Sequence, residues 1–214
     1  MQFDFATLSP ADIYKLMTST ITPRPIAWIT SQDAQGRLNA APFSFFNAFS
    51  ADPPILGIGI GSRPEAETPG PKDTWANIRA TGAFVVQLVD EASVKAMNRT
   101  ATPFPPGDSE LAEAGIETLP STYVAPPRIA SSPVAFECTL FQEIPLGERN
   151  ALILGRVLAM HLRPDALADA DRLHVATETL GLVGRMHGAG WYARTTDLFQ
   201  LSRITLDQWD QGRR

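Results

Sequence analysis

Prolines cut this chain into short segments more strongly than any other feature of the sequence. The 214 residues contain 18 prolines, several of them in clusters at 53–54, 64–71, 103–106 and 126–127. Proline fixes φ and lacks a backbone donor, so such clusters belong in loops or at strand ends. The apolar runs between them include 26–31, 37–41, 55–60, 83–89, 134–142 and 151–162. We therefore expect seven or eight strands with short helices between them, and a barrel in preference to a doubly wound sheet.

Helices are predicted where capping residues precede a suitable segment. Ser9, Pro10 and Asp12 are typical of a first helical turn, and this helix is expected to reach about Met17. Shorter helices are expected after Asp73 or Thr74, over 91–98 and over 109–114. The last strands are expected over 191–194 and 199–204, and the whole chain, 1–214, is expected to form one domain.

Two glycines interrupt the strand predicted over 55–60. Gly57 and Gly59 alternate with isoleucine, so one face of this strand lacks side chains, and either close packing or a bend is expected there. A dinucleotide-binding turn is excluded, because its glycines have to open a helix, whereas here a proline-rich stretch follows.

Charge and composition exclude several classes of function. The net charge of -5, with scattered cations, argues against nucleic acid as a partner. Cys138 is the only cysteine, which excludes an intrachain disulfide and fits a reducing compartment. We see neither a signal peptide nor an apolar run of the roughly 20 residues that a membrane helix needs, and expect a cytoplasmic protein. The three histidines lack metal-ligand spacing, and Ser44 lacks the context of a serine hydrolase.

Three segments carry candidate binding chemistry. Between residues 39 and 47, hydrogen-bonding side chains alternate with aromatic ones, a mixture that suits a flat ring with a polar edge and an anionic tail. Lys72 and Thr74 flank a predicted helix start, which is either an anion site or, more commonly, an ordinary capped helix. In the glycine-rich stretch 184–192, Arg185 is a candidate for neutralising a phosphate and Tyr192 for stacking; a tight hairpin with an aromatic anchor is the alternative.

Taken together, these segments resemble the flavin reductase-like family of FMN-binding split-barrel proteins, in particular its flavoprotein oxygenase branch of the DIM6/NTAB type. The matching segments are Thr22–Trp28, Asn39–Asn47, Asp52–Pro54, Lys72–Thr74 and Gly184–Tyr192. The resemblance implies a mainly β fold, a six-stranded antiparallel FMN-binding split β-barrel with peripheral short α-helices. It also implies a homodimer that binds FMN non-covalently near the subunit interface.

The resemblance also implies roles for individual residues. The segment Ser44–Asn47 would line the isoalloxazine ring and ribityl chain, with the backbone of Phe45 and Phe46 and the side chain of Asn47 at the ring edge. The candidates for the phosphate are Arg24, Ser44, Lys72 and Thr74. Arg185 and Tyr192 would complete the pocket, either from the same chain or from the other subunit of the dimer.

The implied function is that of an FMN-dependent oxidoreductase, which passes hydride or electrons from NAD(P)H or a redox partner to an acceptor such as free flavin, iron or oxygen. The cofactor supplies the chemistry, so no catalytic side chain is assigned. Many reductases of the family carry Gly-Asp-His where this chain has Glu148-Arg149-Asn150, which leaves the use of NAD(P)H open. The alternatives are a non-catalytic FMN carrier or electron-transfer protein, and a relative that binds haem or oxidises a phosphorylated vitamin.

Overall fold

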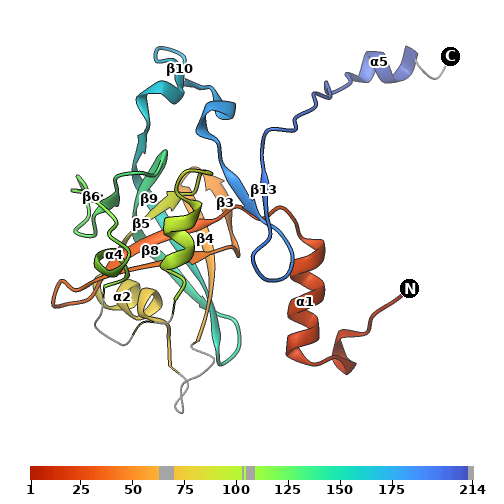
Figure 1. Ribbon diagram of the computed structural model, residues 1–214. Helices are drawn as coiled ribbons and strands as arrows, with labels where there is room; N and C mark the ends of the chain where they lie inside the picture. The colour runs from red at the N-terminus through yellow and green to blue at the C-terminus, as the bar shows by residue number, and fades with distance from the viewer. Residues whose placement is uncertain (63–69, 103, 105–108, 212–214) are drawn as a thin grey trace.

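One curled antiparallel sheet forms the body of the protein in the computed structural model, which describes residues 1–62, 70–102, 104 and 109–211 (Figure 1). Its strands run in the order β2-β1-β5-β8-β9-β4-β3, and all neighbours are antiparallel. They are β1 (Ala27–Gln32), β2 (Leu38–Phe43), β3 (Phe46–Ala51), β4 (Pro54–Gly61), β5 (Ala83–Leu88), β8 (Val134–Pro145) and β9 (Asn150–Leu162). The expectation of a mainly β fold is confirmed, but the sheet has seven strands where six were expected.

Short helices and hairpins surround this sheet. The helices are α1 (Pro10–Thr20), α2 (Asp73–Thr81), α3 (Val94–Arg99), α4 (Glu110–Glu113) and α5 (Leu206–Gln211), with 3-10 turns η1 (Phe5–Thr7), η2 (Pro164–Ala166) and η3 (Thr177–Leu180). The two-stranded hairpins pair β6 (Thr118–Leu119) with β7 (Arg128–Ile129), β10 (Leu167–Asp169) with β11 (His174–Val175), and β12 (Val183–Arg185) with β13 (Tyr192–Arg194).

The sheet encloses a single main core, because it curls until its two ends share buried neighbours. Side chains from β1, β2, β4, β5, β8 and β9 meet in one cluster, to which α2 adds Trp75 and Ile78. The hydrogen-bonded order ends at β2 on one side and at β3 on the other, and these edge strands follow each other in the chain. The turn between them, at Ser44 and Phe45, therefore lies where the barrel is split.

Helix starts follow the local capping chemistry. As predicted, Ser9 caps α1, where its Oγ accepts a hydrogen bond from the backbone N–H of Asp12 at 3.2 Å. The prediction that Asp73 or Thr74 caps α2 is wrong, since the cap position is Lys72. The helix expected over 91–98 begins at Val94 and follows a turn at 91–93, where the Asp90 carboxylate accepts from the N–H of Ser93 at 2.8 Å in the pattern of an N-terminal cap.

The prediction of a final strand over 199–204 is wrong. This stretch lies in an extended arm that leaves the body after β13 and ends in α5 (Figure 1). Its side chains are exposed, so no buried face fixes a register for strand pairing. The proline cluster at 64–71, expected in a loop or at a strand end, falls mostly on residues 64–69, outside the described residues.

The side-chain-free face of β4 is covered by its neighbour β3. A Cβ atom built on Gly57 would overlap the ring of Phe49, and one on Gly59 would lie 3.0 Å from Cβ of Phe45. The prediction of close packing on this face is therefore confirmed. The two rings remain 60% and 44% exposed on their outer sides.

Candidate functional site

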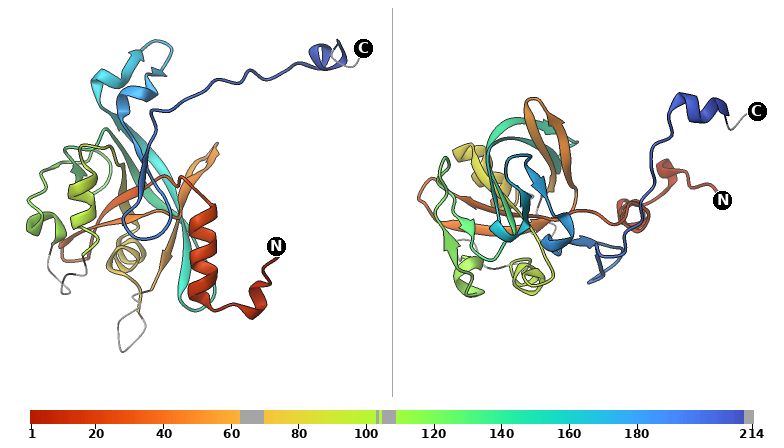
Figure 2. Two further views of the ribbon diagram at one scale, coloured as in Figure 1. Left: turned by 45° about the vertical axis from the view of Figure 1, so that its right-hand side comes forward. Right: turned by 90° about the horizontal axis from the view of Figure 1, so that it is seen from above.

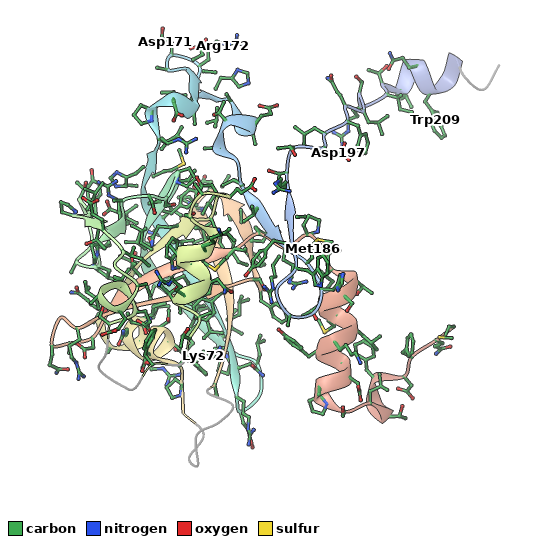
Figure 3. All side chains as sticks on the ribbon, viewed as in Figure 1. Lys72, Asp171, Arg172, Met186, Asp197 and Trp209 are labelled. Atoms are coloured by element: carbon green, nitrogen blue, oxygen red, sulfur yellow. The ribbon has the colours of Figure 1, made fainter. Side chains whose placement is uncertain are left out.

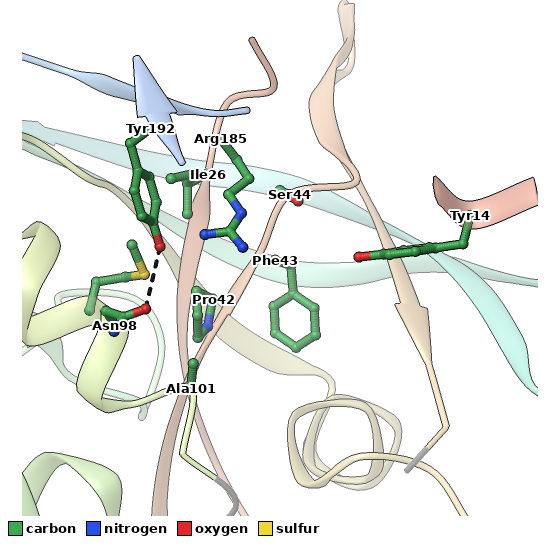
Figure 4. A pocket seen from close by; sticks show the side chains of 10 residues that line it. Tyr14, Ile26, Pro42, Phe43, Ser44, Asn98, Ala101, Arg185 and Tyr192 are labelled. Atoms are coloured by element: carbon green, nitrogen blue, oxygen red, sulfur yellow. Dashed lines mark hydrogen bonds between the residues drawn. The ribbon is translucent and has the colours of Figure 1, made fainter. Parts of the chain in front are cut away.

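A cavity of about 220 Å³ opens beside the split of the barrel (Figure 4). Four separate parts of the chain form its wall: the first strands of the sheet, α1, α3 and the β12–β13 hairpin. The lining residues are Tyr14, Ile26, Pro42, Phe43, Ser44, Met97, Asn98, Ala101, Arg185 and Tyr192. The lining combines aromatic rings with amide, hydroxyl and guanidinium groups, so the cavity suits a flat polar ligand.

The β12–β13 hairpin positions Arg185 and Tyr192, as the sequence predicted for this pair. They are opposite residues of the hairpin ladder, and the guanidinium carbon of Arg185 lies 4.8 Å from the Tyr192 ring centre. Arg185 Nη2 also donates to the carbonyl of Gly188 at 3.1 Å, and the Tyr192 hydroxyl donates to Oδ1 of Asn98 at 3.4 Å. The stacked guanidinium faces the cavity with its charge (Figure 4). The hairpin alternative is confirmed by this pairing, and the same hairpin places the Arg185 guanidinium at the cavity.

Arg24 is buried, and its guanidinium is engaged by the protein itself. Nη1 donates to the carbonyls of Thr18 and Ile21, each at 2.7 Å, and Nη2 donates to the carbonyl of Met186 at 3.0 Å. Nε lies 3.4 Å from Oγ of Ser44. Burial lowers the pKa of Arg24 from its ordinary value. The side chain thus ties the end of α1 and the β12–β13 loop to the cavity residue Ser44.

The segment Ser44–Asn47, expected to line a ring, is divided by the start of β3. Ser44 lines the cavity. Phe45 is partly exposed and stacks against Tyr14, with ring centres 6.1 Å apart. Phe46 packs against the main core, and exposed Asn47 accepts from the next backbone N–H through Oδ1. Among these four side chains, the cavity lining includes that of Ser44.

The structure also separates Lys72 from Thr74. Lys72 Nζ lies 5.8 Å from the ring centre of the cavity residue Phe43, and partial burial lowers the pKa of Lys72. Thr74 is buried, with its Oγ1 hydrogen-bonded at 2.8 Å to the side-chain amide of Asn39. Lys72 therefore lies near the cavity rim, whereas the Thr74 hydroxyl is directed into the protein.

Sequence reasoning missed Tyr14 and Asn98. Tyr14 projects from α1 toward the cavity, and Asn98 comes from the last turn of α3 (Figure 4). Neither belongs to a recognisable motif, because their positions depend on how two helices remote in sequence pack beside the split. The sequence predicts only that each of the two residues lies in a helix.

The described residues lack two kinds of feature. They hold no group of three or more His, Cys, Asp or Glu side chains arranged to bind a metal ion. Among the described helices, none combines the length and apolar character needed to cross a membrane.

The cavity lining, as far as it is described, has Arg185 as its only ionic side chain. An anionic or electron-rich ligand is therefore favoured there.

Comparison with known proteins agrees with this geometry. The family model described as "Flavin reductase like domain" matches residues 17–179. The structure of 2-nitrobenzoate 2-nitroreductase NbaA from Pseudomonas fluorescens is similar at 33% identity and a TM-score of 0.86, covering 96% of this chain and 98% of that chain. Nitrilotriacetate monooxygenase component B from Bacillus cereus has 32% identity and a TM-score of 0.86, with 94% and 98% covered. A protein from Shewanella frigidimarina, assigned as a flavin reductase with a split-barrel domain, shares the fold at 19% identity, a TM-score of 0.79, and 95% and 100% coverage.

Proposed function

Because this chain belongs to the flavin reductase-like family, we propose that it is an FMN-dependent oxidoreductase that moves electrons from NAD(P)H or a redox partner to an acceptor. When bound, the flavin supplies the electron chemistry. The residues of this chain bind and orient it. The observation that carries the proposal is the cavity beside the barrel split, where Arg185, Ser44 and aromatic side chains face one space.

The donor set of the cavity fits a flavin with a phosphate group. Phosphate needs cations and hydroxyl donors, which Lys72, Arg185 and Ser44 provide. The pKa of Lys72 is lowered by withdrawal from water, and a neighbouring phosphate would oppose that shift by favouring the charged form. Phe43, Tyr14 and Tyr192 offer the flat walls that a fused ring needs.

We propose roles for Arg24 and Thr74 that differ from those expected. We propose that Arg24 positions Ser44 and does not contact phosphate, because protein carbonyls already accept from its guanidinium. Thr74 is assigned a supporting role, since its side chain is turned toward the protein interior, whereas the backbone of Phe46 stays a proposed contact at the ring edge. Asn47 and Phe45 are exposed at the start of β3, and we propose that they contact the flavin at the outer rim of the cavity.

We propose a homodimer as the functional unit. At about 220 Å³ the cavity is smaller than the roughly 300–1,000 Å³ of common ligand sites, so one chain offers only part of a flavin site. The outer face of the sheet exposes large apolar side chains, which include Phe49, Phe141, Leu158 and Met160. Such a surface suits a self-complementary interface between two copies.

The names of the two relatives suggest two kinds of acceptor. NbaA is named for reducing an aromatic nitro acid, and the Bacillus cereus protein is named as one component of a monooxygenase. We propose that this chain likewise passes electrons either to a small aromatic molecule or, as reduced flavin, to a partner oxygenase. An anaerobic assay with 2-nitrobenzoate and with free FMN as alternative acceptors separates the two.

The deciding experiment is a visible spectrum of the purified protein, an FMN titration, and then anaerobic addition of NADH or NADPH. Flavin absorbance with stoichiometric FMN binding, followed by bleaching, is the expected result. A colourless protein that binds no FMN would refute the proposal, and a haem spectrum would replace it with the haem-binding alternative.

The second candidate is a non-catalytic FMN carrier or electron-transfer protein. It is favoured by one observation, the Glu148-Arg149-Asn150 sequence where many reductases carry Gly-Asp-His. A carrier binds FMN equally well, but its flavin is not bleached by either nicotinamide.

A further inference from the structure

The last described part of the chain, residues 195–211, forms an arm that stands away from the body in every view (Figures 1 and 2). The arm is attached at its base, where Oγ1 of Thr195 donates to the carbonyl of Leu182 at 2.9 Å. Its far end is ordered by local bonds, as Oγ1 of Thr205 accepts from the N–H of Gln208 and caps α5. The arm therefore has local structure but extends beyond the fold that carries it.

The arm is strongly apolar and exposed at the same time. Phe199 and Leu201 are 91% and 87% exposed, Leu206 is 75% exposed, and half of Trp209 is accessible. Leu198 and Ile204 are exposed as well. A solvated tail is normally poor in such residues, because they gain nothing from contact with water. A concentration of exposed apolar side chains of this kind marks an interaction site.

The same side of the molecule carries a second exposed apolar surface. In both figures α1 and the arm lie on one side of the barrel (Figures 1 and 2). Tyr14 and Met17 on α1 and Ile21 directly after it are exposed, and the Tyr14 ring stacks against Phe45 beside the start of β3. One chain thus presents a projecting apolar arm together with exposed apolar side chains on and beside α1 that its own arm leaves uncovered.

We propose that the arm of one chain packs against a second copy of the same chain, so that the two copies exchange arms. The inference rests on the proposed dimer and adds the element that would hold it. In a two-fold dimer the same surface serves both partners, so an arm and an uncovered apolar side on each chain are matched twice. The copies then bury the arm's apolar side chains without any other protein.

The test is site-specific photocrosslinking with benzoylphenylalanine in place of Phe199, in the full-length protein. The expected result is a covalent dimer on a denaturing gel, with the crosslinked peptide identified by mass spectrometry. The same group in place of Gln35, an exposed residue of the β1–β2 turn, is the matched control and is expected to give no covalent dimer. A dimeric protein whose position 199 crosslinks only within its own chain, or not at all, overturns the proposal.

A substitution series gives an independent readout. Replacing Leu198, Phe199 and Leu201 together by serine is expected to raise the dimer dissociation constant at least ~10-fold, measured by sedimentation, because the lost burial is apolar. Asp197→Ser, on the same exposed arm, is the control and is expected to leave it unchanged (Figure 3). An unchanged constant in the triple variant counts against the arm.

Flavin binding is measured on the same samples, so that the two proposals fail separately. A monomeric protein that binds and uses FMN refutes the proposed exchange of arms but not the proposed oxidoreductase function. A crosslinked dimer that binds no flavin refutes the proposed oxidoreductase function but not the exchange of arms.

Discussion

Arg185 and Tyr192 face each other across the β12–β13 hairpin, with the guanidinium carbon 4.8 Å from the ring centre. The ring holds the cation in place at the cavity, and the hydroxyl adds a long 3.4 Å hydrogen bond to Asn98. The ring should therefore matter more than the hydroxyl for the ligand that Arg185 serves.

Substitutions of Tyr192 test this order. Tyr192→Phe keeps the ring and is expected to change the FMN dissociation constant by less than about 3-fold, because a long neutral hydrogen bond contributes little. Tyr192→Ala removes the stacking surface and is expected to weaken FMN binding by about 10-fold. Fluorescence titration measures both. Equal losses in the two variants would transfer the role from the ring to the hydroxyl.

Lys72→Ala is expected to weaken the binding of FMN more than that of riboflavin. The two ligands differ in the phosphate, which is the group that Lys72 is proposed to neutralise. Because a charge-assisted contact is lost, the affinity for FMN is expected to fall about 10-fold. Calorimetry with both ligands provides the comparison. Lys95→Ala, which removes an exposed cation from α3, is the control. An equal loss of riboflavin affinity would assign Lys72 to the fold or to the ring.

Arg24→Met is expected to destabilise the protein more than it alters ligand chemistry. The substitution keeps much of the side-chain volume but leaves the carbonyls of Thr18, Ile21 and Met186 without their donor. Loss of these partners is expected to lower the free energy of unfolding by about 3 kcal/mol. Urea titration measures it, with Arg37→Met in the exposed β1–β2 turn as the control. Wild-type stability with abolished FMN binding would restore Arg24 as a phosphate ligand.

A buried carboxylate makes stability depend on acid. Glu137, on β8, is buried, which raises its pKa. Hydrogen bonds outweigh that effect and leave the pKa of Glu137 below its ordinary value: the N–H groups of Thr122, Tyr123 and Val124 donate at 2.8, 2.5 and 3.2 Å, and His161 Nε2 lies at 2.5 Å. The stabilisation is complete above the unfolded value of about 4.3 and is lost as pH falls through the lower folded value.

Glu137→Gln removes this dependence. The variant is expected to be less stable than the wild type by roughly 2 kcal/mol at pH 7, because one amide oxygen replaces two charged acceptors. The difference should narrow below about pH 4, as the wild-type carboxylate takes up its proton. Urea midpoints from pH 7 to pH 3 measure it. A stability difference between wild type and variant that stays constant from pH 7 to pH 3 would show that the charge of Glu137 does not contribute to stability.

Much of the fold was predictable because local chemistry decides it. The capping by Ser9 and the glycine-interrupted strand 55–60 depend on nearby residues, and both were predicted from the sequence. The strand predicted over 199–204 failed for the opposite reason. Its apolar residues resemble a strand, but no strand among the described residues pairs with them.

The site was predictable only in part, since a motif does not state which way a side chain points. Lys72 and Thr74 are two positions apart, yet α2 packs so that one lies near the cavity rim and the other is buried against Asn39. Tyr14 and Asn98 reach the same cavity from helices far apart in the chain. Such convergence is fixed by tertiary packing and leaves no local signal.

Two glycines on the sheet allow a matched test of that packing. A Cβ on Gly155 would overlap the ring of Phe84, which is fully buried in the main core, whereas a Cβ on Gly57 would overlap the ring of Phe49, which is 60% exposed. An exposed ring can turn away, but a ring in a close-packed core cannot. Gly155→Ala is therefore expected to lower the free energy of unfolding by about 2 kcal/mol, and Gly57→Ala by distinctly less.

Urea titration at low protein concentration compares these two variants with the wild type. Low concentration matters, because association would bury Phe49 and restrict the ring. At high concentration Gly57→Ala is accordingly expected to weaken the dimer, which sedimentation measures. Gly57→Ala and Gly155→Ala would contradict this prediction if they lowered the free energy of unfolding equally in the dissociated chain. The Phe49 ring would then be unable to turn away, and β3 would be held as firmly as the core strands.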